Sequence, residues 1–238
     1  MRVSRFLPQI VRAGGAAALD YRFDRRSPLP ALDARAFAQL SGDAEVVLPP
    51  LSWAAPGNQS YVGLTFLVTL GRILDAQRVF EIGTYNGATA WCLARNLHAA
   101  EVHTLDLPIE QDPALPYGVG DASNRIAFER RAYDVLPLSD SLVVQHWGDS
   151  ASFDFRPWQR SIDLVYVDGA HSHDYVRKDS ETAFSLVGES GAIVWDDYSR
   201  RIPGVRAVLN ERQEPLLRVP GTRVVLYLAS ALRAALGL

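Results

Sequence analysis

The sequence lacks two features that would place it in well-defined classes of protein: it has almost no cysteine and no long apolar run. Cys92 is the single cysteine among 238 residues, which excludes an intramolecular disulfide framework and a zinc site built from several thiolates. No apolar run approaches the ~20 residues that a membrane-spanning helix needs, and no clear signal-peptide cleavage site follows the N-terminal residues. We therefore expect no integral membrane segment and a reducing, cytoplasmic location.

An excess of positive charge is also missing. The formal net charge is −3, whereas domains that bind nucleic acid usually carry a strongly basic surface. The predicted partner is therefore a small-molecule substrate and not a nucleic acid, and the sequence leaves open whether the chain forms a homo-oligomer. A hydrophobic fraction of 48% with a charged fraction of 21% is typical of a globular chain that can bury its own core.

Apolar segments of strand type and of helix type alternate from residue 61 onward. Strands are predicted at residues 78–83, 101–106, 141–145, 162–168 and 191–196, helices at 61–74, 88–97, 173–187 and 205–211, and a closing hairpin at 217–228. This alternation predicts an α/β fold with a Rossmann-like, doubly wound sheet that is mostly parallel. Residues 1–60, which prolines interrupt, are predicted to form an N-terminal cap or extension, and residues 61–238 a single globular domain. Residues 108–136 are predicted to form either a substrate loop or a surface helix.

A loop with two glycines joins the first strand to the following helix. It contains Glu81, Gly83, Thr84, Tyr85 and Gly87, so its spacing is Gly-x-x-x-Gly and not the Gly-x-Gly-x-x-Gly of dinucleotide sites. Gly83 would allow a sharp turn and the close approach of a ligand to the backbone. The Glu81 carboxylate suits a cationic ligand, such as the sulfonium and amine of S-adenosylmethionine, better than a pyrophosphate. The alternative is that the glycines serve only a tight strand–helix turn.

Acidic residues follow the next two strands. Asp106, followed by Leu107, ends the second strand, and a carboxylate at this position can accept both hydroxyls of a ribose. Gly148, Asp149 and Ser150 end the third strand, where Asp149 would accept a hydrogen bond from the exocyclic amine of adenine. The alternatives are a helix-capping or loop role for Asp106 and an Asx turn at Asp149.

Three further carboxylates follow the fourth and fifth strands, which we expect to be neighbours. They are Asp168, Asp196 and Asp197, and their mutual repulsion would be relieved by a shared cation or proton. An oxygen-rich site of this kind suits Mg²⁺. The alternative is that Asp196 caps the following segment while Asp197 accepts from backbone amides. His171 could take a proton from a substrate hydroxyl, with His173 as a second candidate, so His171 and Asp168 are the predicted catalytic residues.

The order of these motifs resembles the class I S-adenosylmethionine-dependent methyltransferases. The similar segments are Phe-Glu-Ile-Gly-Thr-Tyr-Asn-Gly at 80–87, Thr-Leu-Asp-Leu-Pro at 104–108, Gly-Asp-Ser at 148–150, Val-Asp-Gly-Ala-His at 167–171 and Trp-Asp-Asp-Tyr at 195–198. The resemblance covers roughly residues 61–228. It is greatest to the bacterial subgroup of macrocin-type O-methyltransferases and cephalosporin-hydroxylase-like proteins.

The resemblance implies a fold, a cofactor and a metal site. It implies about seven strands with an antiparallel last strand, and contacts to S-adenosylmethionine from Glu81, Gly83, Asp106 and Asp149. It also implies a metal held by Asp168, Asp196 and Asp197. This chain departs from the subgroup at two positions: relatives often have histidine in place of Asp196, and some metal-dependent members have an acid in place of Ala170.

The sequence therefore predicts an S-adenosylmethionine-dependent enzyme that methylates a hydroxyl of a small molecule. One alternative is a nicotinamide-dependent oxidoreductase, which the glycine spacing and the absence of a Tyr-x-x-x-Lys pair disfavour. Another is a non-catalytic module that binds S-adenosylmethionine, against which the complete set of acids argues. A requirement for Mg²⁺ remains open at this stage.

Overall fold

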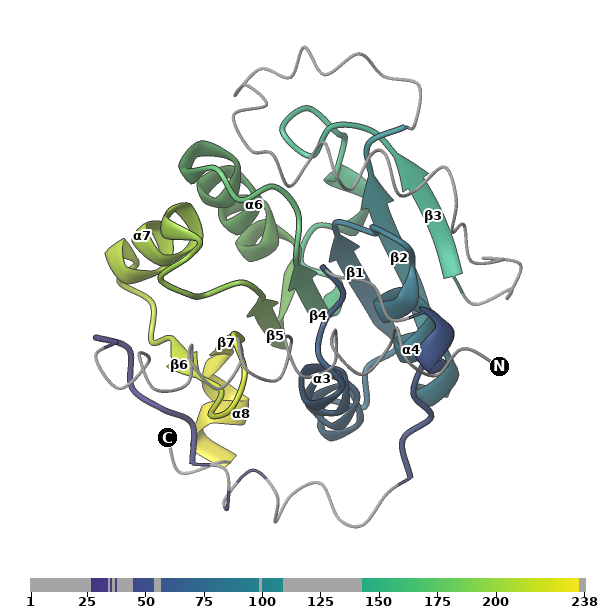
Figure 1. The fold of residues 1–238 in the computed structure, drawn as a ribbon, viewed down its shortest axis with the longest axis horizontal. Coiled ribbons are helices and arrows are strands. Elements are labelled where there is room, and N and C mark those ends of the chain that lie inside the picture. The colour runs from purple at the N-terminus through teal and green to yellow at the C-terminus, as the bar shows by residue number, and fades with distance from the viewer. Residues whose placement is uncertain are drawn as a thin grey trace, which may run out of the picture.

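The sheet has seven strands and lies between two layers of helices (Figure 1). The computed structural model describes residues 27–33, 35, 37, 45–53, 57–98, 100–108 and 143–235. The strands are β1 (Arg78–Ile82), β2 (Glu101–Asp106), β3 (Val143–Trp147), β4 (Ile162–Val167), β5 (Val187–Trp195), β6 (Leu217–Arg218) and β7 (Val225–Leu228). Their order is β3-β2-β1-β4-β5-β7-β6. Neighbouring strands from β3 through β2, β1 and β4 to β5 run parallel, and β7 runs antiparallel to its neighbours β5 and β6. These pairings confirm the predicted Rossmann-like sheet with an antiparallel last strand.

Four helices of the described residues lie within two residues of their predicted bounds, and three short ones were not predicted. They are η2 (Leu51–Trp53), α3 (Tyr61–Ile73), α4 (Ala88–Asn96), η3 (Arg156–Trp158), α6 (His173–Leu186), α7 (Pro203–Glu211) and α8 (Ser230–Ala235). Helix α7 begins two residues earlier than predicted because Pro203 at its first position is compatible with a helix start. No helix in the described part of the chain has the length and apolar character needed to span a bilayer.

Two predicted strands have different bounds in the structure. β3 ends at Trp147, two residues later than predicted, because it pairs with β2 as far as Asp106. β5 begins at Val187, four residues before the predicted start, and a register shift against β4 separates its first pair from the rest. The apolar pattern missed this extension because Gly188, Glu189 and Ser190 are not apolar.

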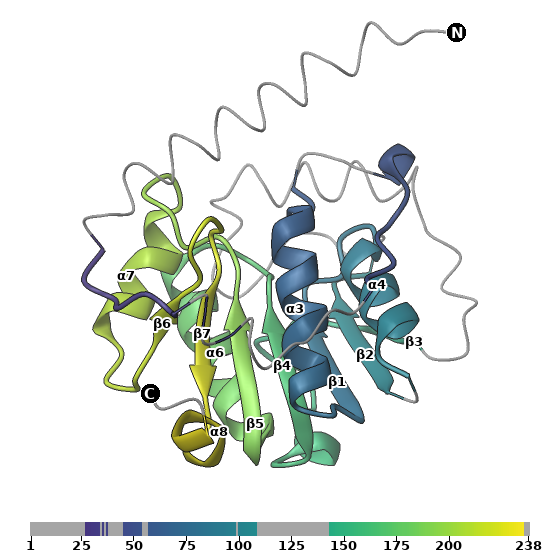
Figure 2. The ribbon, with the colours of Figure 1, turned by 90° about the horizontal axis from the view of Figure 1, so that it is seen from below.

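Both faces of the central strands are buried. Along β4, Leu164 and Tyr166 belong to the core under α3 and α4, whereas Val165 and Val167 belong to the core under α6 and α7. Figure 2 shows α3 on the near side of the sheet and α6 behind it. A strand that is buried on both sides reads as a continuous apolar run, which is why residues 162–167 were predictable.

The described parts of residues 1–60 pack on the main domain. At the outer edge of the sheet, Leu32 donates its backbone N–H to the carbonyl of Arg218 at 2.8 Å, and Arg218 donates to the carbonyl of Pro30 at 2.8 Å. Beside α4, the Asn96 side chain bonds both the N–H and the carbonyl of Val47, at 2.7 and 2.8 Å. The division into an extension and a domain at residue 60 stays a prediction. The predicted substrate loop lies outside the described residues from position 109 onward.

Candidate active site

The predicted site residues come together because parallel strands end at one edge of the sheet. β2, β1, β4 and β5 are consecutive parallel neighbours, so the loops that follow them share that edge. Ligands of open α/β sheets bind beyond this edge. The loops after β1 and β2, with the loop after β3 beside them, carry the predicted cofactor residues, and the loops after β4 and β5 carry the predicted acids and His171.

Gly83 is required by the packing of two loops. Its φ is +101°, and a Cβ at this position would lie 2.1 Å from the carbonyl oxygen of Asp168. Gly87, with φ +77°, begins α4 in the left-handed region, and Tyr85 between them has φ +51°. The glycine spacing therefore serves a tight turn against the end of β4, in addition to any approach of a ligand.

The Asp106 carboxylate is fixed by two backbone amides. Its Oδ2 accepts from the N–H of Tyr85 at 2.8 Å, and its Oδ1 accepts from the N–H of Leu107 at 2.7 Å. Because each carboxylate oxygen has further acceptor capacity, the group can still accept hydroxyl donors. This geometry joins Asp106 to the glycine loop, as the cofactor prediction requires.

Asp149 lies on the next loop and is linked to Asp106 through the backbone. The N–H of Gly148 donates to the carbonyl of Asp106 at 2.9 Å. Asp149 Oδ1 accepts from the Tyr175 hydroxyl and from the N–H of Ala151, both at 3.0 Å. The structure therefore places the 148–150 turn beside the Asp106 loop and ties it to α6.

Glu81, whose predicted contact with the cofactor stays a prediction, lies in the interior of the domain. Its side chain is buried beneath the glycine loop, with the residue 1% exposed, and not open to a ligand at the mouth. Thr104 donates to Glu81 Oε2 at 2.5 Å, Thr84 and Thr104 share a hydrogen bond of 2.7 Å, and Gln145 donates to Thr84 at 3.1 Å. Burial raises the pKa of Glu81 to about 8, although the bond from Thr104 lowers it. Glu81 therefore supports the loop from below as a carboxyl that is mostly protonated at neutral pH.

Glu81→Gln is expected to change how stability depends on pH. Between the ordinary pKa of 4.5 and the folded value of about 8, the folded protein keeps a proton that the unfolded chain has released. The free energy of unfolding of the wild type therefore falls as the pH rises from about 5 to about 8, by on the order of a few kcal/mol relative to the variant. Urea unfolding of both proteins at these two pH values measures the difference.

The control for this comparison is Glu189→Gln, which removes a carboxylate from an exposed position of β5. We expect it to follow the wild type at both pH values. If Glu81→Gln also followed the wild type, Glu81 would be ionised in the folded protein and its assigned protonation would be wrong.

The acids and His171 form a compact cluster after β4 and β5. His171 Nε2 lies 2.8 Å from Asp197 Oδ2, and Tyr166 donates its hydroxyl to Asp168 Oδ2 at 3.0 Å. One donor atom from each of Asp168, His171 and Asp197 lies within 4.8 Å of the others. Arg223, from the turn between β6 and β7, holds Asp197 Oδ1 at 2.7 Å.

Asp196 does not belong to this set of three. Its residue is 3% exposed, and the Gln59 side chain and the Asp197 backbone are the hydrogen-bonding groups that lower the pKa of its carboxyl. Its nearest described cation is Arg223, whose Nη2 lies 3.7 Å from Asp196 Oδ2. Burial and the neighbouring Asp197 raise the pKa of Asp196 to about 6. The cluster of three donor atoms therefore contains His171, and the predicted role of Asp196 as a metal ligand stays a prediction.

The three carboxylates have different electrostatic environments. Burial and the charges of Asp196 and Asp197 raise the pKa of Asp168 well above its ordinary value. Burial also raises the pKa of Asp197, but the hydrogen bond with His171 and the charge of Arg223 outweigh it, so the net pKa is lowered. Asp197 has φ +61°, a conformation that is uncommon outside glycine and concentrates at functional sites.

The donor set fits a divalent cation. Two carboxylates and one imidazole are ligands that divalent metals accept, and a cation would relieve the repulsion that raises the pKa of Asp168. Asp196 adds negative charge beside the cluster, which Arg223, at 3.7 Å from its Oδ2, compensates in part. Sequence reasoning missed Arg223, because its position in the closing hairpin gave no sign that it reaches the acids.

The fold and the loops at its strand ends define a Rossmann-like cofactor-binding domain. A family model described as a methyltransferase domain matches residues 80–198, which is 119 of the 238 residues, or half of the chain. The chain therefore belongs to this methyltransferase family, and the prediction of a methyltransferase is confirmed. No curated protein sequence matches the chain.

The chain is also similar to solved structures, at low sequence identity. The SAH-bound methyltransferase PaMTH1 of Podospora anserina is 16% identical, with 96% of this chain and 97% of that chain covered and a TM-score of 0.50. The O-methyltransferase from Bacillus cereus in complex with SAH is 16% identical, with 89% and 97% covered and a TM-score of 0.49. The O-methyltransferase TomG of Streptomyces achromogenes, in complex with SAM, is 20% identical, with 90% and 96% covered and a TM-score of 0.46. At these identities the likeness concerns the fold alone.

Proposed function

We propose that the chain transfers the methyl group of S-adenosylmethionine to a hydroxyl oxygen of a small molecule. The observation that carries the proposal is the His171–Asp197 pair, at 2.8 Å, beside the loop that Asp106 anchors. The family supports methyl transfer, and the SAH and SAM in the solved neighbours are consistent with this methyl donor. Membership of the macrocin-type subgroup is part of the same proposal.

The residues after β1, β2 and β3 would bind S-adenosylmethionine and orient its methyl group. Asp106 would accept the ribose hydroxyls with a carboxylate that two backbone amides already hold in place. Asp149, held by Tyr175, would accept from the adenine amine. Gly148 and Ser150 flank Asp149, and Thr84 and Gly87 shape the glycine loop. These residues contribute by positioning the reacting carbon and excluding water, because the sulfonium supplies a methyl group that is already electrophilic.

The acidic side of the site would take the proton of the acceptor hydroxyl. If His171 donates its Nε2–H to Asp197, the lone pair of the neutral ring lies on Nδ1, where a proton can be accepted. Asp197, which Arg223 and His171 favour in its ionised form, would stabilise the imidazolium that results. This arrangement is a His–Asp pair of the kind that orients a general base.

A divalent cation, with Mg²⁺ the proposed ion, would be held by Asp168 and Asp197. When bound, such a cation lowers the pKa of a hydroxyl that it contacts. Asp196 would add negative charge behind these ligands and does not need to touch the ion. His171 remains the proposed base in this arrangement, although its imidazole belongs to the same cluster of donor atoms.

Calorimetric titration of the purified chain with S-adenosylhomocysteine tests the proposal, with and without Mg²⁺ and with NADH as the control ligand. We expect micromolar affinity for S-adenosylhomocysteine and no binding of NADH. A transfer assay with labelled S-adenosylmethionine then compares hydroxylated acceptors with their methyl ethers. Absence of S-adenosylhomocysteine binding under both conditions would contradict the proposal, and binding of NADH would favour the oxidoreductase alternative.

A further inference from the structure

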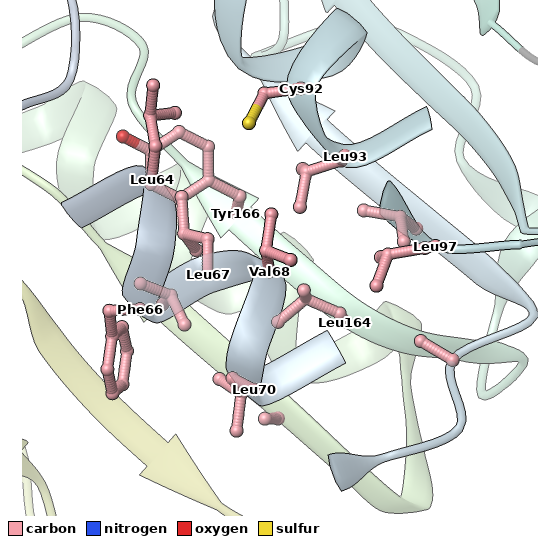
Figure 3. Packing of buried hydrophobic residues seen from close by; sticks show 14 of the residues in the cluster. Leu64, Phe66, Leu67, Val68, Leu70, Cys92, Leu93, Leu97, Leu164 and Tyr166 are labelled. Carbon is pink, nitrogen blue, oxygen red and sulfur yellow. The ribbon is translucent and has the colours of Figure 1, made fainter. Parts of the chain in front are cut away.

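Tyr166 is a buried residue that the proposed reaction does not use. It lies on β4 two positions before Asp168 and is 0% exposed. Figure 3 shows its ring among apolar side chains of α3 and α4, with Leu64 and Leu67 close by. A phenylalanine would fill this space with the same shape. The hydroxyl therefore needs a separate explanation, because a buried hydroxyl is unfavourable unless it is hydrogen-bonded.

The Tyr166 hydroxyl has two polar partners, and their chemistry fixes the direction of both bonds. Gln59 Nε2 donates to the hydroxyl oxygen at 3.0 Å, since an amide nitrogen has no acceptor capacity. The single hydroxyl proton is then donated to Asp168 Oδ2 at 3.0 Å. Hydrogen bonds in such a chain strengthen one another, so Gln59 makes Tyr166 a better donor to Asp168.

The start of α3 holds Gln59 in place. Its Oε1 accepts from the N–H of Ser60 at 2.7 Å, and Ser60 is the N-cap of α3, accepting from Gly63. A Cβ on Gly63 would lie 2.2 Å from Gln59 Oε1, so the glycine leaves the space that the Gln59 side chain occupies. Gln59 is 6% exposed, and its orientation is therefore set by the helix and not by solvent.

We propose that Tyr166 and Gln59 are positioning residues that fix the rotamer of the Asp168 carboxylate at the mouth of the site. The inference deepens the proposed function, because it assumes that Asp168 serves the methyl transfer. Tyr166 approaches from the sheet and Gln59 from the residue just before the N-cap of α3, so two parts of the scaffold determine where one carboxylate oxygen points. Outer residues of this kind typically change activity or metal affinity by about 10- to 100-fold when they are replaced.

Tyr166→Phe tests the proposal, because it removes one hydroxyl and retains the ring. We expect kcat to fall by about 10- to 100-fold, while the KM for S-adenosylmethionine and the Kd for S-adenosylhomocysteine stay within about twofold. The matched control is Tyr198→Phe. Tyr198 is also buried, and its hydroxyl bonds Ser27 and Asn210, both at 2.6 Å, with no carboxylate involved. Its kcat should stay within about twofold of the wild type.

Crystal structures of the wild type and of Tyr166→Phe separate this inference from the proposed function. We expect the Asp168 carboxylate to leave its wild-type rotamer in the variant. An unmoved Asp168 carboxylate, or an unchanged kcat, would overturn the positioning role. The comparison of the Asp168 rotamers tests this role even if the wild type binds no S-adenosylhomocysteine and the proposed function fails. If Tyr166→Phe does not fold, Gln59→Leu removes the donor to Tyr166. The hydroxyl can still bond Asp168, so we expect a smaller fall in kcat and a longer Tyr166–Asp168 distance, and no change in either would overturn the role of Gln59.

Discussion

Asp106→Ala is expected to weaken the binding of S-adenosylhomocysteine by about 100-fold or more. A hydrogen bond to a charged group contributes about 1.5–3 kcal/mol, so the loss of two ribose hydroxyl contacts removes about 3–6 kcal/mol, and each 1.4 kcal/mol corresponds to about tenfold in Kd. The variant also releases the N–H groups of Tyr85 and Leu107, which loosens the glycine loop. Calorimetric titration of the variant measures the effect.

Asp163→Ala is the matched control for Asp106→Ala. Asp163 Oδ2 also accepts from two backbone amides, those of Gln77 and Arg78 at 2.8 and 2.9 Å, but it lies at the other end of β4. Replacing Asp163 should lower the melting temperature of the protein and leave the Kd for S-adenosylhomocysteine within about twofold of the wild-type value. If both variants lost S-adenosylhomocysteine binding to the same extent, we would attribute the effect of Asp106→Ala to a loss of protein stability. If neither variant lost binding, the proposed contact between Asp106 and the ribose would be wrong.

His171→Ala is expected to reduce kcat by about 10²- to 10⁴-fold, which is the usual contribution of a general base. The Kd for S-adenosylhomocysteine should stay within about threefold, because His171 follows β4 on the acidic side of the site and the nucleotide residues follow β1, β2 and β3. Steady-state kinetics on an accepted hydroxyl compound, together with titration of S-adenosylhomocysteine, separates the two quantities.

His173→Ala provides the comparison for His171→Ala. This second histidine lies two residues further along, at the first position of α6. Its side chain is 44% exposed, and it contacts Asp174 and Glu211 at the surface. We expect its kcat to stay within about threefold of the wild type. Wild-type turnover in His171→Ala would remove the base from the proposed mechanism and leave His171 as a structural partner of Asp197.

The sequence predicted the positions of the strand ends well, and with them the neighbourhood of the site. Buried parallel strands read as apolar runs, and the acids that follow them gather because those strands end at one edge. The directions of individual side chains were less predictable. Glu81 points beneath the loop because alternation along β1 places it on the same face as Thr104 of β2.

The presence of His171 in the donor cluster has a similar origin. Asp196 and Asp197 are adjacent, and the left-handed conformation of Asp197 determines which carboxylate faces His171. The Gln59–Tyr166 bond joins residues 107 positions apart, and no local pattern reports such a contact. These features depend on tertiary geometry and not on the composition of a segment.

The pairing of residues 30–32 with β6 affects the behaviour of any shortened form of the chain. β6 is two residues long and is the last strand in the order of the sheet, and its backbone groups bond Pro30 and Leu32. Strands with unpaired edges act as templates for aggregation. A protein trimmed to residues 61–238 would expose these groups of Arg218 to solvent and to other copies of itself. Residues 30–32 thus cover part of the sheet edge that would otherwise be open to a second copy of the chain.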